Sequence, residues 1–202
     1  MTDRINTKKG RWGNYTLKEN PMRFFLPNEW KLFINNTNPK NRFFYEFLFQ
    51  TGMRYNEAKN IQIKNFDFKN RIVIILKPKG GRKNLRYLNY TKQFKDKIKS
   101  FIDLHELKGD DYLGFTTIQG LIKNIKSVCK RSGIKDYDNF SVHTIRKTHE
   151  NYLLTLNKPI ERITQHIGHN INTAREHYIS GLLIKEKNDI EKINEWLGGM
   201  FE

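Results

Sequence analysis

Residues 71–88, RIVIILKPKGGRKNLRYL, contain two extended stretches separated by residues that favour a turn. The first stretch, residues 71–76, is rich in β-branched side chains, which are typical of strands. The second, residues 85–88, resumes extended character after a proline and a pair of glycines. The two stretches therefore predict an antiparallel β-hairpin, and the lysines and arginines between them predict a basic loop.

The residues before this hairpin favour helices. Pro27 suits the first position of a helix, where its fixed φ angle and missing N–H are tolerated. A second helix is predicted by apolar residues at helical spacing, Phe43, Phe44, Phe47 and Leu48. Gly52 is placed to end that helix, and Arg54 opens a short helix through Glu57. The aromatic residues are most simply part of the core.

The chain after the hairpin is predicted to be helical in several short segments that start at Lys92. Ser141 is a suitable N-cap for one helix, and Pro159 and Gly168 suit the start and the end of the next. A further helix is expected to hold Tyr178. The predicted fold class is therefore mainly α with one small antiparallel β-sheet (α+β).

The charge of the chain indicates an anionic partner. Its 202 residues include 37 Lys/Arg and 21 Asp/Glu, which gives a net charge of +16. A positive field of this strength favours nucleic acid as the partner. Binding to a membrane surface would need a basic amphipathic helix or a lipidation signal, and the sequence shows neither. We therefore expect double-stranded DNA, and no membrane, as the partner.

The cysteine and apolar content indicates the compartment. Cys129 is the single cysteine, so the chain cannot form an internal disulfide framework, and a reducing compartment is favoured. No apolar run approaches the roughly 20 residues of a membrane span, and the first residues lack a signal peptide. These features predict a soluble, cytoplasmic protein.

Five places in the chain carry a pattern of chemically active residues. They are residues 51–57 (Thr-Gly-Met-Arg-Tyr-Asn-Glu), residues 79–81 (Lys-Gly-Gly), residues 143–146 (His-Thr-Ile-Arg), residues 167–169 (Ile-Gly-His) and Tyr178. In this order, and with the tyrosine nine residues after the last histidine, the chain resembles the tyrosine recombinase and phage-integrase family, including Xer-type enzymes. The resemblance extends over about residues 22–180, and it implies the fold of the family's catalytic domain.

The residue types in this pattern suit the transfer of a phosphoryl group. Two arginine forks, at Arg54 and Arg146, can bind the charged oxygens of a phosphate in its transition state. A phenol has a pKa of about 10, so Tyr178 needs help to act as a nucleophile. His143 can accept its proton. The pattern therefore places the chemistry on arginine, histidine and tyrosine side chains.

The resemblance implies an enzyme that cleaves and rejoins DNA through a 3′-phosphotyrosine on Tyr178. Bond energy is kept in that intermediate, so no energy cofactor is needed. The resemblance further implies that Lys79 protonates the departing 5′ oxygen, that His169 supports the phosphate, and that Glu57 orients a catalytic cation. Two alternatives remain open at this point: a type IB topoisomerase-like nicking-closing enzyme, and a non-catalytic DNA-binding relative.

The hairpin loop and the segment after it are strongly basic. Between residues 77 and 99 there are nine Lys/Arg and a single Asp, which suits a surface that follows phosphates and is less typical of a solvated face. Lys79 is preferred to its neighbours as the general acid because it directly precedes the paired glycines. The other cations of the hairpin are predicted to contact DNA: Lys77, Arg82, Lys83 and Arg86.

A metal site is weighed and set aside. His166, His169, His177 and Cys129 are candidate ligands, but their spacing matches no compact zinc motif. No metal and no other cofactor is predicted.

The expected organisation is a basic N-terminal arm over residues 1–21 and a catalytic domain over residues 22–202. The arm is either a solvated tail or a DNA contact. Family members usually carry a separate core-binding domain before this pattern, and only some twenty residues precede it here. A C-terminal helix from about residue 184 either folds back on its own domain or is donated to a neighbouring protomer. We expect a monomer in solution that assembles as a tetramer on DNA, in keeping with an integrase or resolvase encoded by a virus or a plasmid.

Overall fold

The computed structural model describes residues 7–10, 13–16, 24–76, 85–168, 184 and 186–201. Before the predicted hairpin the described elements are β1 (Thr7–Gly10), β2 (Gly13–Thr16), α1 (Pro27–Asn35), α2 (Pro39–Thr51), α3 (Tyr55–Ala58), the 3-10 turn η1 (Ile63–Asn65) and β3 (Phe66–Asp67). The later ones are β4 (Ile72–Ile75), β5 (Arg86–Asn89), α4 (Lys92–Leu104), α5 (Ile118–Arg131), η2 (Tyr137–Asn139), α6 (Val142–Thr155), α7 (Ile160–Ile167) and α9 (Lys187–Leu197). The predicted fold class, mainly helical with a small antiparallel sheet, is confirmed.

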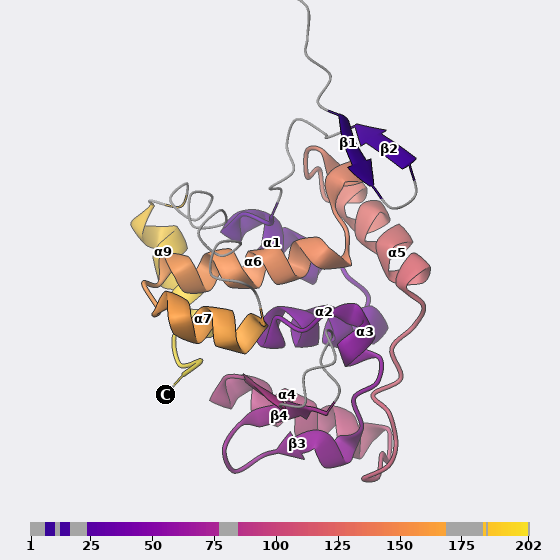
Figure 1. Cartoon of the computed structure of the whole chain (residues 1–202), viewed down its shortest axis with the longest axis vertical. Coiled ribbons are helices and arrows are strands. Elements are labelled where there is room, and N and C mark those ends of the chain that lie inside the picture. Colours follow the sequence, from indigo (N-terminus) through magenta and orange to yellow (C-terminus); the bar gives the residue numbers. More distant parts are fainter. Residues whose placement is uncertain are drawn as a thin grey trace, which may run out of the picture.

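The predicted hairpin is present as β4 and β5. The two strands pair antiparallel, with Ile72 opposite Asn89 and Ile75 opposite Arg86. β3 adds a third strand on the outer side of β4, which the sequence did not predict because two residues are too few for a periodic signal. The sheet and α4 lie together at one end of the molecule, below the helices α2, α6 and α7 in Figure 1. β5 contacts both α2 and α7, so the hairpin is attached directly to the helical part.

A second hairpin lies in the predicted N-terminal arm. β1 and β2 pair antiparallel from Thr7 opposite Thr16 to Gly10 opposite Gly13, and they form a sheet separate from β3–β5. Polar strands of four residues carry little alternation, and for this reason the sequence did not predict them.

Two glycines end helices at the places that the sequence predicted. Gly52 follows α2 with a φ of 59°, and Gly168 follows α7 with a φ of 72°. Both values lie in the left-handed region, which favours glycine at a helix C-terminus. Gly52 is also tightly packed, because a Cβ atom there would lie 2.5 Å from Cδ2 of His149. Ser141 precedes α6 as expected, but the cap bond runs the other way, from the Ser141 N–H to Oγ1 of Thr144 (3.0 Å).

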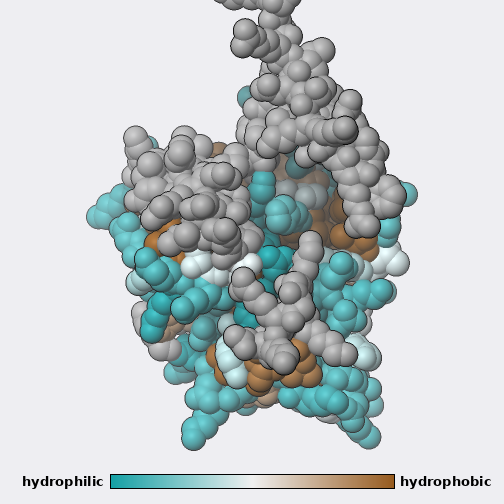
Figure 2. Space-filling model, viewed as in Figure 1, coloured by the Kyte–Doolittle hydropathy of each residue, from teal (hydrophilic) through white to brown (hydrophobic). Residues whose placement is uncertain are grey.

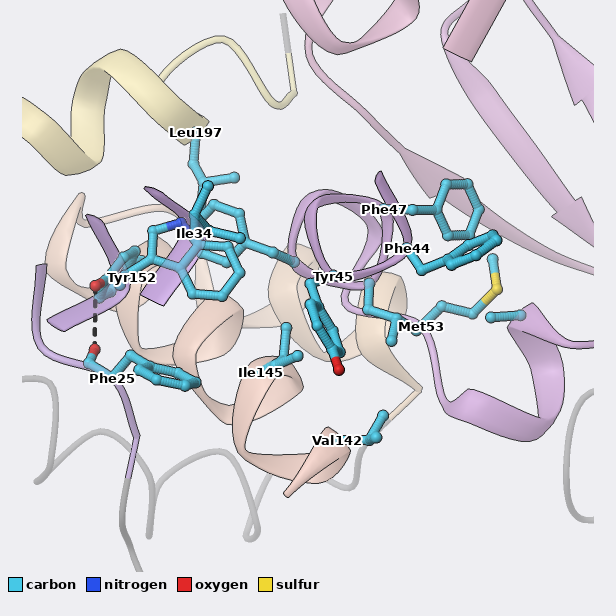
Figure 3. Packing of buried hydrophobic residues seen from close by; sticks show 14 of the residues in the cluster. Phe25, Ile34, Phe44, Tyr45, Phe47, Met53, Val142, Ile145, Tyr152 and Leu197 are labelled. Atoms are coloured by element: carbon cyan, nitrogen blue, oxygen red, sulfur yellow. Dashed lines mark hydrogen bonds between the residues drawn. The ribbon is translucent and has the colours of Figure 1, made fainter. Parts of the chain in front are cut away.

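α6 is the central helix, and almost all of its residues are buried. Figure 3 shows Val142, Ile145 and Tyr152 pointing from α6 into the apolar cluster. The Tyr152 hydroxyl donates a hydrogen bond to the Phe25 carbonyl (3.0 Å), drawn dashed in Figure 3, and the Phe25 N–H donates to Thr148 Oγ1 (3.0 Å). Thr148 and Tyr152 of α6 thus bind both main-chain polar groups of Phe25, and this fixes the segment before α1 to α6.

The C-terminal helix α9 packs on its own chain. Ile193 and Leu197 are buried, and α9 contacts α1 and α6. The Gln50 side chain donates to the Trp196 carbonyl (3.0 Å), and the Lys158 amine donates to the Gly198 carbonyl (2.7 Å). Of the two arrangements left open by the sequence, this structure has the one in which the helix folds back. None of the helices in the described part of the chain has the length and apolar character of a membrane span.

Candidate active site

One pocket brings together four of the predicted site residues. It has a volume of about 900 Å³, and its lining includes Arg54, Glu57, His143 and Arg146. These side chains come from α3, from the residue before it, and from the first turns of α6, which are far apart in the sequence. Figure 2 shows the same side of the molecule as Figure 1, with hydrophilic surface over much of the described area and hydrophobic patches beside it.

Arg146 is held by two helix C-termini. Its Nη1 donates to the Gly52 carbonyl (2.6 Å) after α2, and its Nη2 donates to the Ile167 carbonyl (2.7 Å) at the end of α7. The C-terminal ends of helices are electronegative, so both contacts favour a cation. Burial, and then repulsion from Arg54 and Arg86, lower the pKa of Arg146 to about 9. Arg146 is 2% exposed, and with a pKa of about 9 its guanidinium stays charged at neutral pH.

Arg54 lies at the start of α3, just after the left-handed turn at Gly52. Its Nη1 pairs with Oε1 of Glu57 (3.1 Å), and its Nη2 donates to the Gly168 carbonyl (3.1 Å). The side chain is 29% exposed, so the guanidinium is anchored on one side and open to the pocket on the other.

Glu57 is the carboxylate that forms ion pairs with both Arg54 and Arg86. Its Oε2 accepts from the main-chain N–H of Arg54 (3.0 Å) and pairs with Nη2 of Arg86 (2.6 Å). Burial alone would raise the pKa of Glu57, but the charge of Arg86 and the Arg54 N–H bond hold this pKa below its ordinary value. Glu57 therefore stays ionised, with each oxygen engaged by an arginine.

Arg86 is predicted above to contact DNA with the other hairpin cations, but the structure places it differently. Its side chain is 10% exposed and points to Glu57. The prediction rested on charge alone, which Arg86 shares with its neighbours. Side chains alternate along the strand, so Arg86 lies on the same face as the buried Leu88, and Tyr87 is exposed on the other.

Together these groups form an anion site. Three arginines and one glutamate leave an excess of two positive charges around the pocket. His143 adds an exposed imidazole at the pocket's edge, in the first turn of α6. An excess of fixed arginine donors beside one histidine suits the binding of a phosphate and the transfer of a proton next to it.

Two buried histidines lie behind the arginines, and the sequence did not identify them as part of the site. The rings of His149 and His166 stack with centroids 5.2 Å apart, and the His149 ring fills the space beside Gly52. His166 Nδ1 accepts from the Asn89 N–H (3.3 Å), so the pair also touches β5. The sequence feature that could have identified His149 is its helical spacing, one turn after Arg146.

Acid is expected to destabilise the protein through this pair. Burial, and then the charge of Arg146, lower the pKa of His149 to about 4, from 6.5 for the free side chain; Glu150 acts in the opposite direction. Burial, and then His149, Arg86 and Arg146, lower the pKa of His166 in the same direction. Between pH 6.5 and 4 the unfolded chain takes up these protons and the folded chain does not.

The free energy of unfolding should therefore fall as the pH drops from 6.5 to 4, by about 3 kcal/mol from His149 alone. Urea unfolding at several pH values measures this slope. His149→Phe keeps a ring of similar size and should reduce the slope to the part that His166 contributes. An unchanged slope in this variant would contradict the assignment.

The remaining predicted residues lie outside the described ones. They are Lys77, Lys79, Arg82, Lys83, His169, His177 and Tyr178. Of the described residues next to these gaps, Leu76 lines the pocket, and the Gly168 carbonyl accepts a hydrogen bond from Arg54, which also lines it.

Comparison with known proteins agrees with this geometry. Residues 23–182 match the Phage integrase family, and the chain belongs to that family. The fold is that of a tyrosine recombinase catalytic domain. A probable integrase/recombinase of Acholeplasma phage L2 is 26% identical over 159 residues, which are 76% of this chain and 53% of the relative.

Solved structures share the fold at low sequence identity. XerA recombinase is 19% identical, with a TM-score of 0.66 over 86% of this chain and 62% of the other. The Tn1549 transposon integrase, solved in complex with transposon right-end DNA, is 16% identical, with a TM-score of 0.66 over 85% of this chain and 64% of the other. This chain thus spans between about half and two thirds of the length of these proteins.

Proposed function

We propose that this chain is the catalytic part of a site-specific DNA recombinase that cleaves and rejoins DNA through a 3′-phosphotyrosine. The observation that carries the proposal is the pocket in which Arg54 and Arg146, each held by main-chain oxygens, lie beside His143. Preorganised donors of this kind stabilise the charge that develops on a phosphate during displacement.

In the proposed reaction the Tyr178 oxygen attacks the scissile phosphorus and the bond to the 5′ oxygen breaks. Arg54 and Arg146 bind the two non-bridging oxygens, and His143 accepts the phenol proton. Lys79 donates a proton to the departing 5′ oxygen, and His169 supports the phosphate. A free 5′ hydroxyl then attacks the phosphotyrosine in the reverse sense, so the strand is rejoined without an energy cofactor.

The proposed partner is double-stranded DNA, for which Lys77, Lys83 and Arg82 supply phosphate contacts. The net charge of +16 supports this, as does the DNA bound to the Tn1549 integrase. We further propose assembly into a tetramer on DNA, a basic arm over residues 1–21 ahead of the catalytic domain over residues 22–202, and action in the cytoplasm. The phage-encoded relative supports an origin in a mobile element.

The proposal is tested by incubating the protein with a supercoiled plasmid library of random inserts and denaturing the products. We expect protein joined covalently to 3′ DNA ends, and recombinant plasmids from inserts that contain the target. Relaxed plasmids without recombinants would indicate a nicking-closing enzyme instead. Retarded but chemically unchanged plasmids would indicate a DNA-binding relative, and would overturn the proposal.

A further inference from the structure

Arg86 occupies an unusual place for a charged residue of a hairpin. It is the first residue of β5, directly after the exposed Leu85, and yet its side chain is 10% exposed. The adjacent Tyr87 is 50% exposed, so the strand turns the arginine into the protein and the tyrosine out of it. Because burying a guanidinium is costly unless it is paired, the ion pair with Glu57 at 2.6 Å is the reason it can lie there.

Arg86 touches both groups that hold Arg54. One is Glu57, whose Oε1 pairs with Nη1 of Arg54. The other is Gly168, whose carbonyl accepts from Nη2 of Arg54. The Arg86 guanidinium lies against the Cα of Gly168, so closely that a Cβ atom there would collide with Nη1 of Arg86.

This arrangement controls how Arg54 can use its N–H groups. A carboxylate with Arg54 as its one cationic partner would be free to bind both Nη groups in a fork. Arg86 occupies Oε2 of Glu57, which leaves Arg54 a single contact through Oε1. The second Nη of Arg54 then bonds to Gly168, and the remaining N–H groups can face the pocket.

We propose that Arg86 is a positioning residue: by holding Glu57 and packing on Gly168, it directs the Arg54 guanidinium toward the phosphate. The proposal rests on the proposed function, because it concerns the same phosphate site. It also connects β5, which carries Arg86, to the site.

The test compares single-turnover cleavage by Arg86→Met, Arg86→Lys and Glu57→Gln at saturating DNA. Loss of a residue that orients a ligand typically costs roughly 10- to 100-fold in activity, and we expect this for Arg86→Met, with a smaller loss for Arg86→Lys. DNA affinity and its salt dependence should stay as in the wild type. Since both residues act through one contact, Arg86→Met with Glu57→Gln should be no slower than the slower single variant.

Lys108→Met removes an exposed cation outside the basic segment of residues 77–99 and serves as the control. If Arg86 instead contacts a phosphate of DNA, Arg86→Met should lower the salt slope by about 0.9 and leave cleavage at saturation unchanged, which would overturn the proposal. Unchanged cleavage with an unchanged salt slope would overturn it as well. If Arg86→Met does not fold, Arg86→Lys gives the same comparison.

A second measurement separates this proposal from the proposed function. Orthovanadate, a phosphate analogue, is titrated without DNA against the wild type, Arg86→Met and Arg54→Lys. Weaker vanadate binding by both variants supports the positioning role even in a protein that forms no DNA adduct. Wild-type vanadate affinity in Arg86→Met, together with impaired binding in Arg54→Lys, would overturn the positioning role and leave the proposed function intact.

Discussion

Arg146→Lys is expected to slow DNA cleavage by roughly 100- to 1000-fold, the usual result of losing one preorganised donor to a developing oxyanion. A lysine amine is a point charge and cannot reach the Gly52 and Ile167 carbonyls while offering a flat pair of N–H groups to the phosphate. DNA binding should change little, because the other cations of this strongly basic chain remain. Single-turnover cleavage and equilibrium binding at one salt concentration measure the two effects.

The same change should also lower stability by roughly 1–3 kcal/mol, because a buried carbonyl loses its donor. Arg131→Lys is the matched control, since Arg131 also donates to a main-chain oxygen at a helix end, that of Asn36, but on the surface. It should cleave at the wild-type rate. A slow Arg131→Lys variant, or a fast Arg146→Lys variant, would contradict the role given to Arg146.

Tyr178→Phe is expected to abolish the covalent adduct, because it removes the attacking oxygen and little else. Folding and DNA binding should persist. Three buried tyrosines offer poor substitutes: burial raises the pKa of Tyr45, Tyr90 and Tyr152, so their hydroxyls do not ionise readily. Denaturing gels of a nicked duplex that traps the adduct make the comparison.

Tyr87 provides the control for this experiment, because it is exposed and next to Arg86. Tyr87→Phe should form the adduct as the wild type does. An adduct that persists in Tyr178→Phe and disappears in Tyr87→Phe would identify Tyr87, and not Tyr178, as the nucleophile.

The sequence predicted those features that depend on local chemistry. The ends of α2 and α7 followed from Gly52 and Gly168, because a left-handed residue is needed there and glycine supplies it. The β4–β5 hairpin followed from two extended runs and a turn between them. The short strands β1, β2 and β3 could not be predicted, because two to four residues show too little periodicity.

The candidate site was predicted in part. Arg54, His143, Arg146 and Glu57 meet in one pocket, although only their order along the chain, and not their distances, can be read from the sequence. The inward direction of Arg86 depends on strand register, and the stacking of His149 on His166 depends on the packing of α6 against α7. Both contacts are tertiary features, which strand alternation at Arg86 and helical spacing at His149 do not specify on their own.

The anchoring of the two cations has a consequence for how far such a chain can diverge. Arg146 and Arg54 hold on to the main-chain oxygens of Gly52, Ile167 and Gly168, and every amino acid supplies such an oxygen. Substitutions along α2 and α7 can therefore accumulate without disturbing the anchors, provided that the chain still turns where these helices end. Sequence divergence of this kind is consistent with the fold that this chain shares with XerA recombinase at 19% identity.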